Sequence, residues 1–243
     1  MTNQLFNHLT TNMPVYLLSD DLIFPSPQLA SEEGLLAVGG DLSRERLLLA
    51  YHMGIFPWYS KDEPIMWWSP DPRLVLYPAE LKVSKSLEKA IKKRRFKVTM
   101  DQAFESVIKA CAHSRTRMQE GTWIVNDMIA AYCRLHESGL AHSVETWQAG
   151  KLAGGLYGVS LGKCFFGESM FTRISNASKV AFVALVEHLQ AFNFNLIDCQ
   201  ITSAHLLSFG AREICRARFL DELKKSLKSP TIKGKWSLSP LPV

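Results

Sequence analysis

Three strand-like segments in a row, followed by one long apolar helix, constrain the fold of this chain more than any other feature. Strands are expected at three places between residues 141 and 171, and the first two meet at a turn around Gly150. The run 178–192 predicts a buried helix, and 195–201 predicts one more buried strand. Strands grouped ahead of helices in one mixed sheet indicate an α+β fold.

The N-terminal part of the chain differs in character from this pattern. A short helix is expected between an N-cap at Ser43 and a stop at Gly54. The stretch 56–73 then holds three of the six tryptophans and four prolines, which forbid a continuous helix. We interpret this stretch as a seam between a small N-terminal domain, residues 1–70, and a larger domain, residues 71–243.

Positive charge is concentrated in one segment. The net charge is 28 − 23 = +5, but residues 82–97 carry eight basic side chains and one acid, a charge of +7, so the rest sums to −2. Ser84 or Ser86 can cap a helix through this segment, on which four lysines share one face: Lys85, Lys89, Lys92 and Lys93. A solvated helix face normally interleaves acids with bases. The segment therefore favours a polyanion partner, with nucleic acid backbone first, over a plain solvated face.

Several classes of protein and site are disfavoured by what the sequence lacks. Five scattered cysteines without metal-ligand spacing indicate free thiols in a reducing compartment. The N-terminus does not read as a signal peptide, and the longest apolar run, Val180 to Val186, is far too short for a bilayer. No dinucleotide, P-loop or zinc-protease motif is present. We therefore expect a soluble cytoplasmic protein with no metal and no cofactor.

Three polar residues lie on strands that are otherwise apolar. Glu168 is flanked by aromatic residues, and Asp198 and Gln200 share one face of the strand 195–201. Buried polar groups are costly unless they have partners. They either satisfy one another and a nearby loop backbone, or converge on a pocket, and two acids among three groups favour the pocket.

Several longer motifs carry a family resemblance. FPWYS, WWSPDPR, EGTWI, GGLYGVSLG, GESMF, NASK and LIDCQ occur in this order between about Phe24 and Leu223. With them the chain closely resembles the leucyl/phenylalanyl-tRNA–protein transferases. The resemblance implies a small N-terminal domain and a C-terminal domain like the GCN5-related N-acetyltransferase (acyl-CoA N-acyltransferase) fold. It implies a cytoplasmic enzyme that moves Leu or Phe, and Met less well, from aminoacyl-tRNA to proteins that begin with Arg or Lys. These proteins would then enter the N-degron pathway. The sequence does not reveal the oligomeric state, and a monomer is the default expectation.

The resemblance also implies roles for the polar residues. Asp198 and Gln200 match the family's proposed catalytic pair, and Glu168 matches a residue linked to positioning of the amine. Asp198 could accept the proton directly or through Gln200. The Gln200 amide is not basic, so it would position the amine or donate to the oxyanion.

The same resemblance implies a substrate site. The walls of an aminoacyl pocket fall at Leu156, Phe182, Leu185, Leu189 and Ile197. Trp58 and Trp123 match positions that stack on the terminal adenine, and the basic helix would contact the acceptor stem. From the residues alone, ordinary core packing explains the five apolar residues and both tryptophans equally well.

Two rival functions remain open on the sequence. A CoA-dependent N-acetyltransferase would carry a Gly-rich turn for the pyrophosphate, but the matching junction reads FTRISNASK without glycine. A non-catalytic RNA-binding module would explain the basic helix and the aromatic residues, but not the buried Glu168, Asp198 and Gln200.

Overall fold

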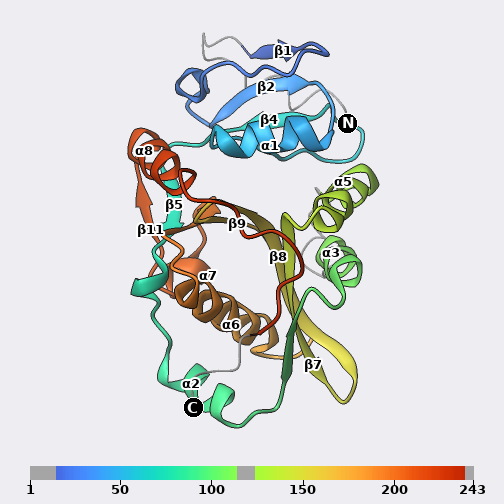
Figure 1. The fold of residues 1–243 in the computed structure, drawn as a ribbon, viewed down its shortest axis with the longest axis vertical. Coiled ribbons are helices and arrows are strands. Elements are labelled where there is room, and N and C mark those ends of the chain that lie inside the picture. Colours follow the sequence, from blue (N-terminus) through green and yellow to red (C-terminus); the bar gives the residue numbers. More distant parts are fainter. Residues whose placement is uncertain (1–14, 114–123, 239–243) are drawn as a thin grey trace.

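The strands form two sheets, shown in Figure 1. The computed structural model describes residues 15–113 and 124–238. The first sheet has the order β1-β2-β4-β3, built from β1 (Tyr16–Leu18), β2 (Leu35–Gly39), β3 (Phe56–Pro57) and β4 (Met66–Trp68). Helix α1 (Arg44–His52) lies against it (Figure 1). The N-terminal part is thus a small sheet with one helix.

The second sheet has seven strands in the order β11-β5-β10-β9-β8-β7-β6. Its strands are β5 (Arg73–Leu76), β6 (Lys97–Met100), β7 (Ala141–Gln148), β8 (Lys151–Leu161), β9 (Cys164–Thr172), β10 (Leu196–Gln200) and β11 (Arg212–Ile214). Strands β9 and β10 run parallel, and the other neighbours pair antiparallel. This mixed sheet with its helices confirms the predicted α+β class.

Helices cover both faces of the second sheet. The helices that follow α1 are α2 (Lys85–Lys92), α3 (Phe104–Ala112), α5 (Asn126–Glu137), α6 (Ala177–Ala191), α7 (Ala204–Leu207) and α8 (Arg216–Ser226), with single 3-10 turns at Pro27–Leu29 and Pro78–Glu80. Neighbouring residues of β8 alternate between two apolar clusters: Tyr157 packs in the cluster of α3 and α5, and Leu156 packs in the cluster of α6. Because side chains alternate along a strand, the two sets of helices lie on opposite faces.

Local sequence signals explain most of these elements. The Ser43 hydroxyl accepts from the Arg46 amide and caps α1, and the Ser84 hydroxyl caps α2 in the same way. The hairpin between β7 and β8 turns at Gly150, whose φ of +72° suits glycine. These three predictions are confirmed.

The strands of the first sheet, and β5 and β11, were not predicted. Most of these strands have two to four residues, too few to show an alternation of apolar and polar residues. Prolines also suggested irregular chain, but Pro57 lies in β3, an edge strand, where a missing amide is tolerated.

The two sheets share a continuous apolar core. One cluster of buried side chains joins Leu47 and Trp67 of the N-terminal part to Val107 of α3 and Leu135 of α5. The division at residue 70 therefore does not coincide with a break in the apolar core. Among the described residues, no helix combines the length and hydrophobicity that a membrane crossing requires.

The chain after α8 packs back against the second sheet. Trp236 is buried and stacks on His142 with ring centres 3.8 Å apart. Its backbone amide donates to Asp101 at 2.7 Å, and the same carboxylate accepts from His142 Nδ1 at 2.8 Å. The ring of His188 of α6 also packs near Trp236, with ring centres 4.7 Å apart. Two histidines therefore hold the C-terminal segment in place.

Acidification is expected to destabilise this contact. Burial lowers the pKa of His188 to about 4 and also lowers the pKa of His142. A lowered histidine pKa means that the unfolded chain binds the extra proton first, so stability falls as the pH drops from about 6.5 toward 4. The free energy of unfolding, measured in urea, should fall less for His188→Gln than for the parent protein between pH 7 and 4.5. The difference should be about 2 kcal/mol, at about 1.4 kcal/mol per pKa unit. Parallel curves for the two proteins would contradict this.

Candidate active site

A cavity of about 300 Å³ opens where β9 and β10 separate. The two strands pair only from Leu196 to Asp198 of β10, and the residues that follow on both strands line the cavity. The lining residues are Phe56, Pro57, Trp58, Leu156, Tyr157, Phe165, Gly167, Glu168, Ser169, Met170, Phe182, Leu185, Ile197, Cys199, Gln200, Ile201, Ser203, His205 and Leu206. Both parts of the chain thus contribute to one pocket.

Seven of the residues singled out from the sequence meet in this cavity. They are Trp58, Leu156, Glu168, Phe182, Leu185, Ile197 and Gln200. Leu189 is fully buried in the core and does not line it. Asp198 is fully buried beside it, and Trp123 lies outside the described residues.

Glu168 is the carboxylate on the cavity wall. It is 7% exposed and accepts three hydrogen bonds, from Tyr51 Oη at 2.8 Å, Tyr132 Oη at 2.9 Å and Gln200 Nε2 at 2.9 Å. Burial raises the pKa of Glu168 to about 7, while these three hydrogen bonds oppose the rise. The group can therefore take up or release a proton near neutral pH.

The two tyrosines also contact each other through their hydroxyls. Burial and the neighbouring Glu168 raise the pKa of both Tyr51 and Tyr132 well above the ordinary value. Both remain neutral donors at neutral pH. Tyr51 comes from α1 and Tyr132 from α5, so two helices far apart in the sequence orient one carboxylate.

Asp198 has a different environment from Glu168. Arg73 Nε donates to its Oδ1 at 2.8 Å and Arg73 Nη2 to its Oδ2 at 2.7 Å, and both side chains are buried. The backbone amide of Gln200 donates to the same Oδ1 at 2.9 Å. These bonds face the protein interior, and Asp198 does not line the cavity.

Several residues of the site were missed in the sequence. Tyr51 and Tyr132 are fully buried on two helices, where they look like ordinary core residues. Arg73 stands in the WWSPDPR motif, but nothing in that motif indicates its partner. His205 was left equally open to a structural or a functional role by the sequence; it lines the cavity, its Nε2 is buried without a partner among the described residues, and burial lowers its pKa.

The inner part of the cavity is apolar. Leu156, Phe182, Leu185 and Ile197 are almost fully buried, and Phe165 joins them. Such a wall favours a hydrophobic side chain. Within the described residues, no group of three or more His, Cys, Asp or Glu could hold a metal ion.

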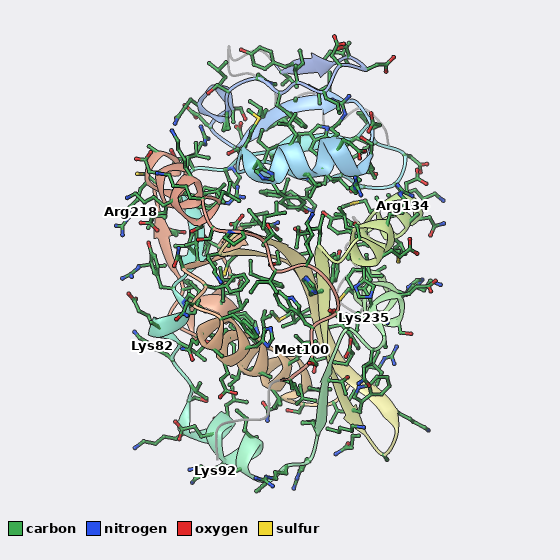
Figure 2. All side chains as sticks on the ribbon, viewed as in Figure 1. Lys82, Lys92, Met100, Arg134, Arg218 and Lys235 are labelled. Carbon is green, nitrogen blue, oxygen red and sulfur yellow. The ribbon has the colours of Figure 1, made fainter. Side chains whose placement is uncertain are left out.

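Lys85, Lys89 and Lys92 of α2 and Lys93 directly after it are exposed, and Figure 2 shows Lys92 at the end of the molecule opposite the N-terminal sheet. In the part of the chain that the structure describes, none of them forms a salt bridge. One acid, Glu88, lies on the same helix, so this surface keeps a net positive charge.

Comparison with known proteins identifies the family. A family model described as leucyl/phenylalanyl-tRNA protein transferase matches residues 75–224, and the model of that family's N-terminal domain matches 40–71. A leucyl/phenylalanyl-tRNA–protein transferase of Desulfatibacillum aliphaticivorans is 61% identical, over 93% of this chain and 97% of its own. The chain belongs to the leucyl/phenylalanyl-tRNA–protein transferase family. As a member it is an aminoacyltransferase, and the family's substrates are aminoacyl-tRNA and protein.

Other relatives agree with this assignment. The transferase of Desulforapulum autotrophicum is 58% identical over 92% of this chain and 98% of its own length. Among solved structures, an aminoglycoside acetyltransferase from an uncultured soil sample covers 45% of this chain and 81% of its own at 17% identity. Its TM-score is 0.35, too low to carry an argument about the fold.

Proposed function

We propose that this transferase moves Leu or Phe, and Met less well, from aminoacyl-tRNA to the α-amine of proteins that begin with Arg or Lys. Modified proteins would then be degraded through the N-degron pathway in the cytoplasm. One observation carries the proposal: an apolar cavity of about 300 Å³ has a titratable carboxylate, Glu168, on its wall. A domain boundary near residue 70 and a likeness of residues 71–243 to the GCN5-related N-acetyltransferase fold belong to the same proposal. The separation of β9 from β10 supports the likeness to an acyltransferase fold, because it leaves a cavity between the two strands that a substrate could enter.

The reaction exchanges an ester for an amide. The neutral amine nitrogen of the acceptor attacks the ester carbonyl, a C–N bond forms, and the bond to the ribose oxygen of the tRNA breaks. The amine loses a proton, and the released ribose oxygen gains one. An aminoacyl ester is already activated, so the enzyme mainly orients the two substrates and moves the proton.

Glu168 is suited to accept the amine proton. The α-ammonium form of the acceptor has a pKa of about 7.7–8.0, close to the value of about 7 for Glu168, so the proton transfer that yields the neutral attacking amine is nearly balanced. Gln200 would position the amine or donate to the oxyanion, and the vicinal ribose hydroxyl could pass a proton to the leaving oxygen. Asp198, held by Arg73 away from the cavity, is better suited to align Gln200 than to take the proton.

The cavity mouth offers a surface for the terminal adenine. Trp58 lines the cavity, is 38% exposed, and packs against Trp68 with ring centres 5.6 Å apart. The Trp68 indole also donates to the Trp58 carbonyl at 2.6 Å. A base stacked on such a ring gains about 1–3 kcal/mol. Trp123 would stack on the same base.

Transfer can be tested directly with charged Phe-tRNA and peptides that differ only in the first residue. Phe should join peptides that begin with Arg or Lys, and peptides that begin with Ala or Glu should stay unmodified. Acetyl-CoA in place of the charged tRNA should give no product. Transfer to every peptide would remove the proposed acceptor specificity, and acetylation would favour the acetyltransferase.

Charge reversal on α2 should weaken tRNA binding. Changing Lys85, Lys89 and Lys92 to Glu is expected to raise the KM for aminoacyl-tRNA about tenfold or more, because phosphate contacts are lost. The slope of log KM against log salt should fall by about 2. The matched control reverses the exposed Lys224, Lys225 and Lys228 at the end of α8. Equal effects in the two variants would show that net charge, and not the α2 surface, binds tRNA.

A further inference from the structure

The guanidinium of Arg73 is buried between two aromatic rings. It is 1% exposed, with the ring of Phe56 4.8 Å away and the ring of Phe219 4.5 Å away. Phe56 comes from β3 of the first sheet and Phe219 from α8. The rings restrict the guanidinium, and its Nε and Nη2 grip both oxygens of Asp198.

This ion pair needs a reason other than stability. Taking two charges out of water costs about as much as their attraction returns, so a buried pair adds little to stability compared with an apolar pair of the same volume. A bidentate pair does fix geometry, because the fork of the arginine sets the plane of the carboxylate. The ion pair therefore serves to fix the orientation of the Asp198 carboxylate oxygens.

One of these oxygens holds the backbone at Gln200. Asp198 Oδ1 accepts from the Gln200 amide at 2.9 Å, and Gln200 has a φ of +62°, in the left-handed region that side-chain-bearing residues avoid. The register between β10 and β5 also shifts between Asp198 and Gln200. Such a backbone persists where its surroundings hold it.

The left-handed backbone in turn sets where the Gln200 side chain lies. Gln200 lines the cavity, and its Nε2 donates to Glu168 Oε1 at 2.9 Å. An unbroken series of contacts therefore runs from Arg73 through Asp198 and Gln200 to Glu168. Arg73 itself does not line the cavity.

We propose that Arg73 is a positioning residue: through Asp198 it fixes the left-handed backbone of Gln200 and so directs the Gln200 amide onto the Glu168 carboxylate. The proposal rests on the proposed function in one respect, the use of Glu168 in the reaction. The geometry of the series stands without it. Arg73→Lys would keep the charge but lose the planar, two-pronged hydrogen bonding of the guanidinium. Asp198 could then rotate and no longer accept from the backbone amide of Gln200.

The test measures the titration of Glu168 by carbon NMR of the labelled carboxyl group, without substrate. The hydrogen bond from Gln200 lowers the pKa of Glu168, so Arg73→Lys should raise the midpoint by about one pH unit. Gln200→Ala should raise it by a similar amount, and the double variant no further, because both changes remove the same bond. Additive shifts, or an unchanged midpoint in a folded Arg73→Lys protein, would overturn the proposal.

Kinetics provide the second readout. Arg73→Lys should lower kcat about tenfold or more with less than a threefold change in the KM for aminoacyl-tRNA. Arg46→Lys is the matched control: Arg46 is equally buried, but pairs with Asp41 and with backbone carbonyls in the N-terminal part. The control should leave kcat and the Glu168 midpoint unchanged. An equal loss of kcat in both variants would overturn the proposal.

Asp198→Asn provides a second test of the proposal in case the Arg73→Lys protein does not fold. Its side-chain amide would face Arg73 Nη2, a donor against a donor, so the pair should loosen while the volume stays the same. Because loss of the Asp198 charge by itself lowers the pKa of Glu168, this variant is read from the chemical shift of the Gln200 side-chain amide, which should move as it does in Arg73→Lys. A parental chemical shift would overturn the proposal. Loss of transfer by the parent protein would instead refute the proposed function, while the NMR shifts would still report on Arg73.

Discussion

Glu168→Gln should lower kcat by about 100-fold or more, with a much smaller change in the KM for aminoacyl-tRNA. The change keeps the shape of the side chain but removes the carboxylate that we propose as proton acceptor, and a positioned acceptor contributes about 10²–10⁴-fold. Because the pKa of Glu168 is raised to about 7, kcat of the parent enzyme should rise with pH through about 7. The residual activity of the variant should lack this inflection.

A second buried glutamate supplies the control. Glu145 is fully buried and accepts from Thr99 Oγ1 and Ser143 Oγ, each at 2.5 Å, but it does not line the cavity. Glu145→Gln should keep the inflection and most of kcat. If both variants lose activity equally, burial of a carboxylate, and not its place in the cavity, matters to the enzyme.

The pH dependence of stability provides an independent test of the raised pKa of Glu168. Its pKa rises from 4.5 to about 7 on folding, so its contribution to stability is present below pH 4.5 and lost as the pH rises through 7. The free energy of unfolding of Glu168→Gln, relative to the parent, should therefore increase by about 2–3 kcal/mol between pH 4.5 and 8, at about 1.4 kcal/mol per pKa unit. Urea unfolding at several pH values measures this difference.

Leu185→Ala is expected to change the choice between Leu and Phe as the transferred amino acid. Leu185 lines the cavity, so its removal leaves a void beside a bound Leu side chain, whereas the longer Phe ring still reaches the opposite wall. We expect kcat/KM for Leu to fall about 10–100-fold and kcat/KM for Phe to fall less, because a few methylenes in an apolar pocket carry that range of discrimination. Competition between Leu-tRNA and Phe-tRNA for one peptide measures the ratio.

Leu189→Ala is the matched variant on the same helix. Leu189 is fully buried but lies outside the cavity, so its truncation should cost about 2–5 kcal/mol of stability and leave the Leu-to-Phe ratio unchanged. A shift of the ratio in Leu189→Ala, or none in Leu185→Ala, would contradict the assignment of the aminoacyl pocket to this cavity.

The parts of the fold that were predicted from the sequence are those that local residue patterns determine. The β7–β8 hairpin, the caps of α1 and α2 and the buried α6 follow from alternation, helical spacing and single capping residues. The short strands of the first sheet carry too few residues for such a pattern.

The site was predictable only in part. Glu168 and Gln200 were found because polar residues interrupt apolar strands, and they lie together in the cavity. Arg73 pairs with a residue 125 positions away, and no local pattern reports such a distance. Tyr51 and Tyr132 differ from core residues only by a hydroxyl, so only the fold reveals that both reach Glu168.

The strand order of the second sheet has a consequence for synthesis of the chain. β5 leaves the ribosome early, but both of its neighbours, β10 and β11, come from the last fifth of the sequence. Until they emerge, Arg73 has no Asp198 to bind and β5 has two open edges. A nascent chain that stalls before residue 196 therefore has an unformed active site and an exposed apolar strand, so the enzyme becomes active only after residues 196–214 have been synthesised.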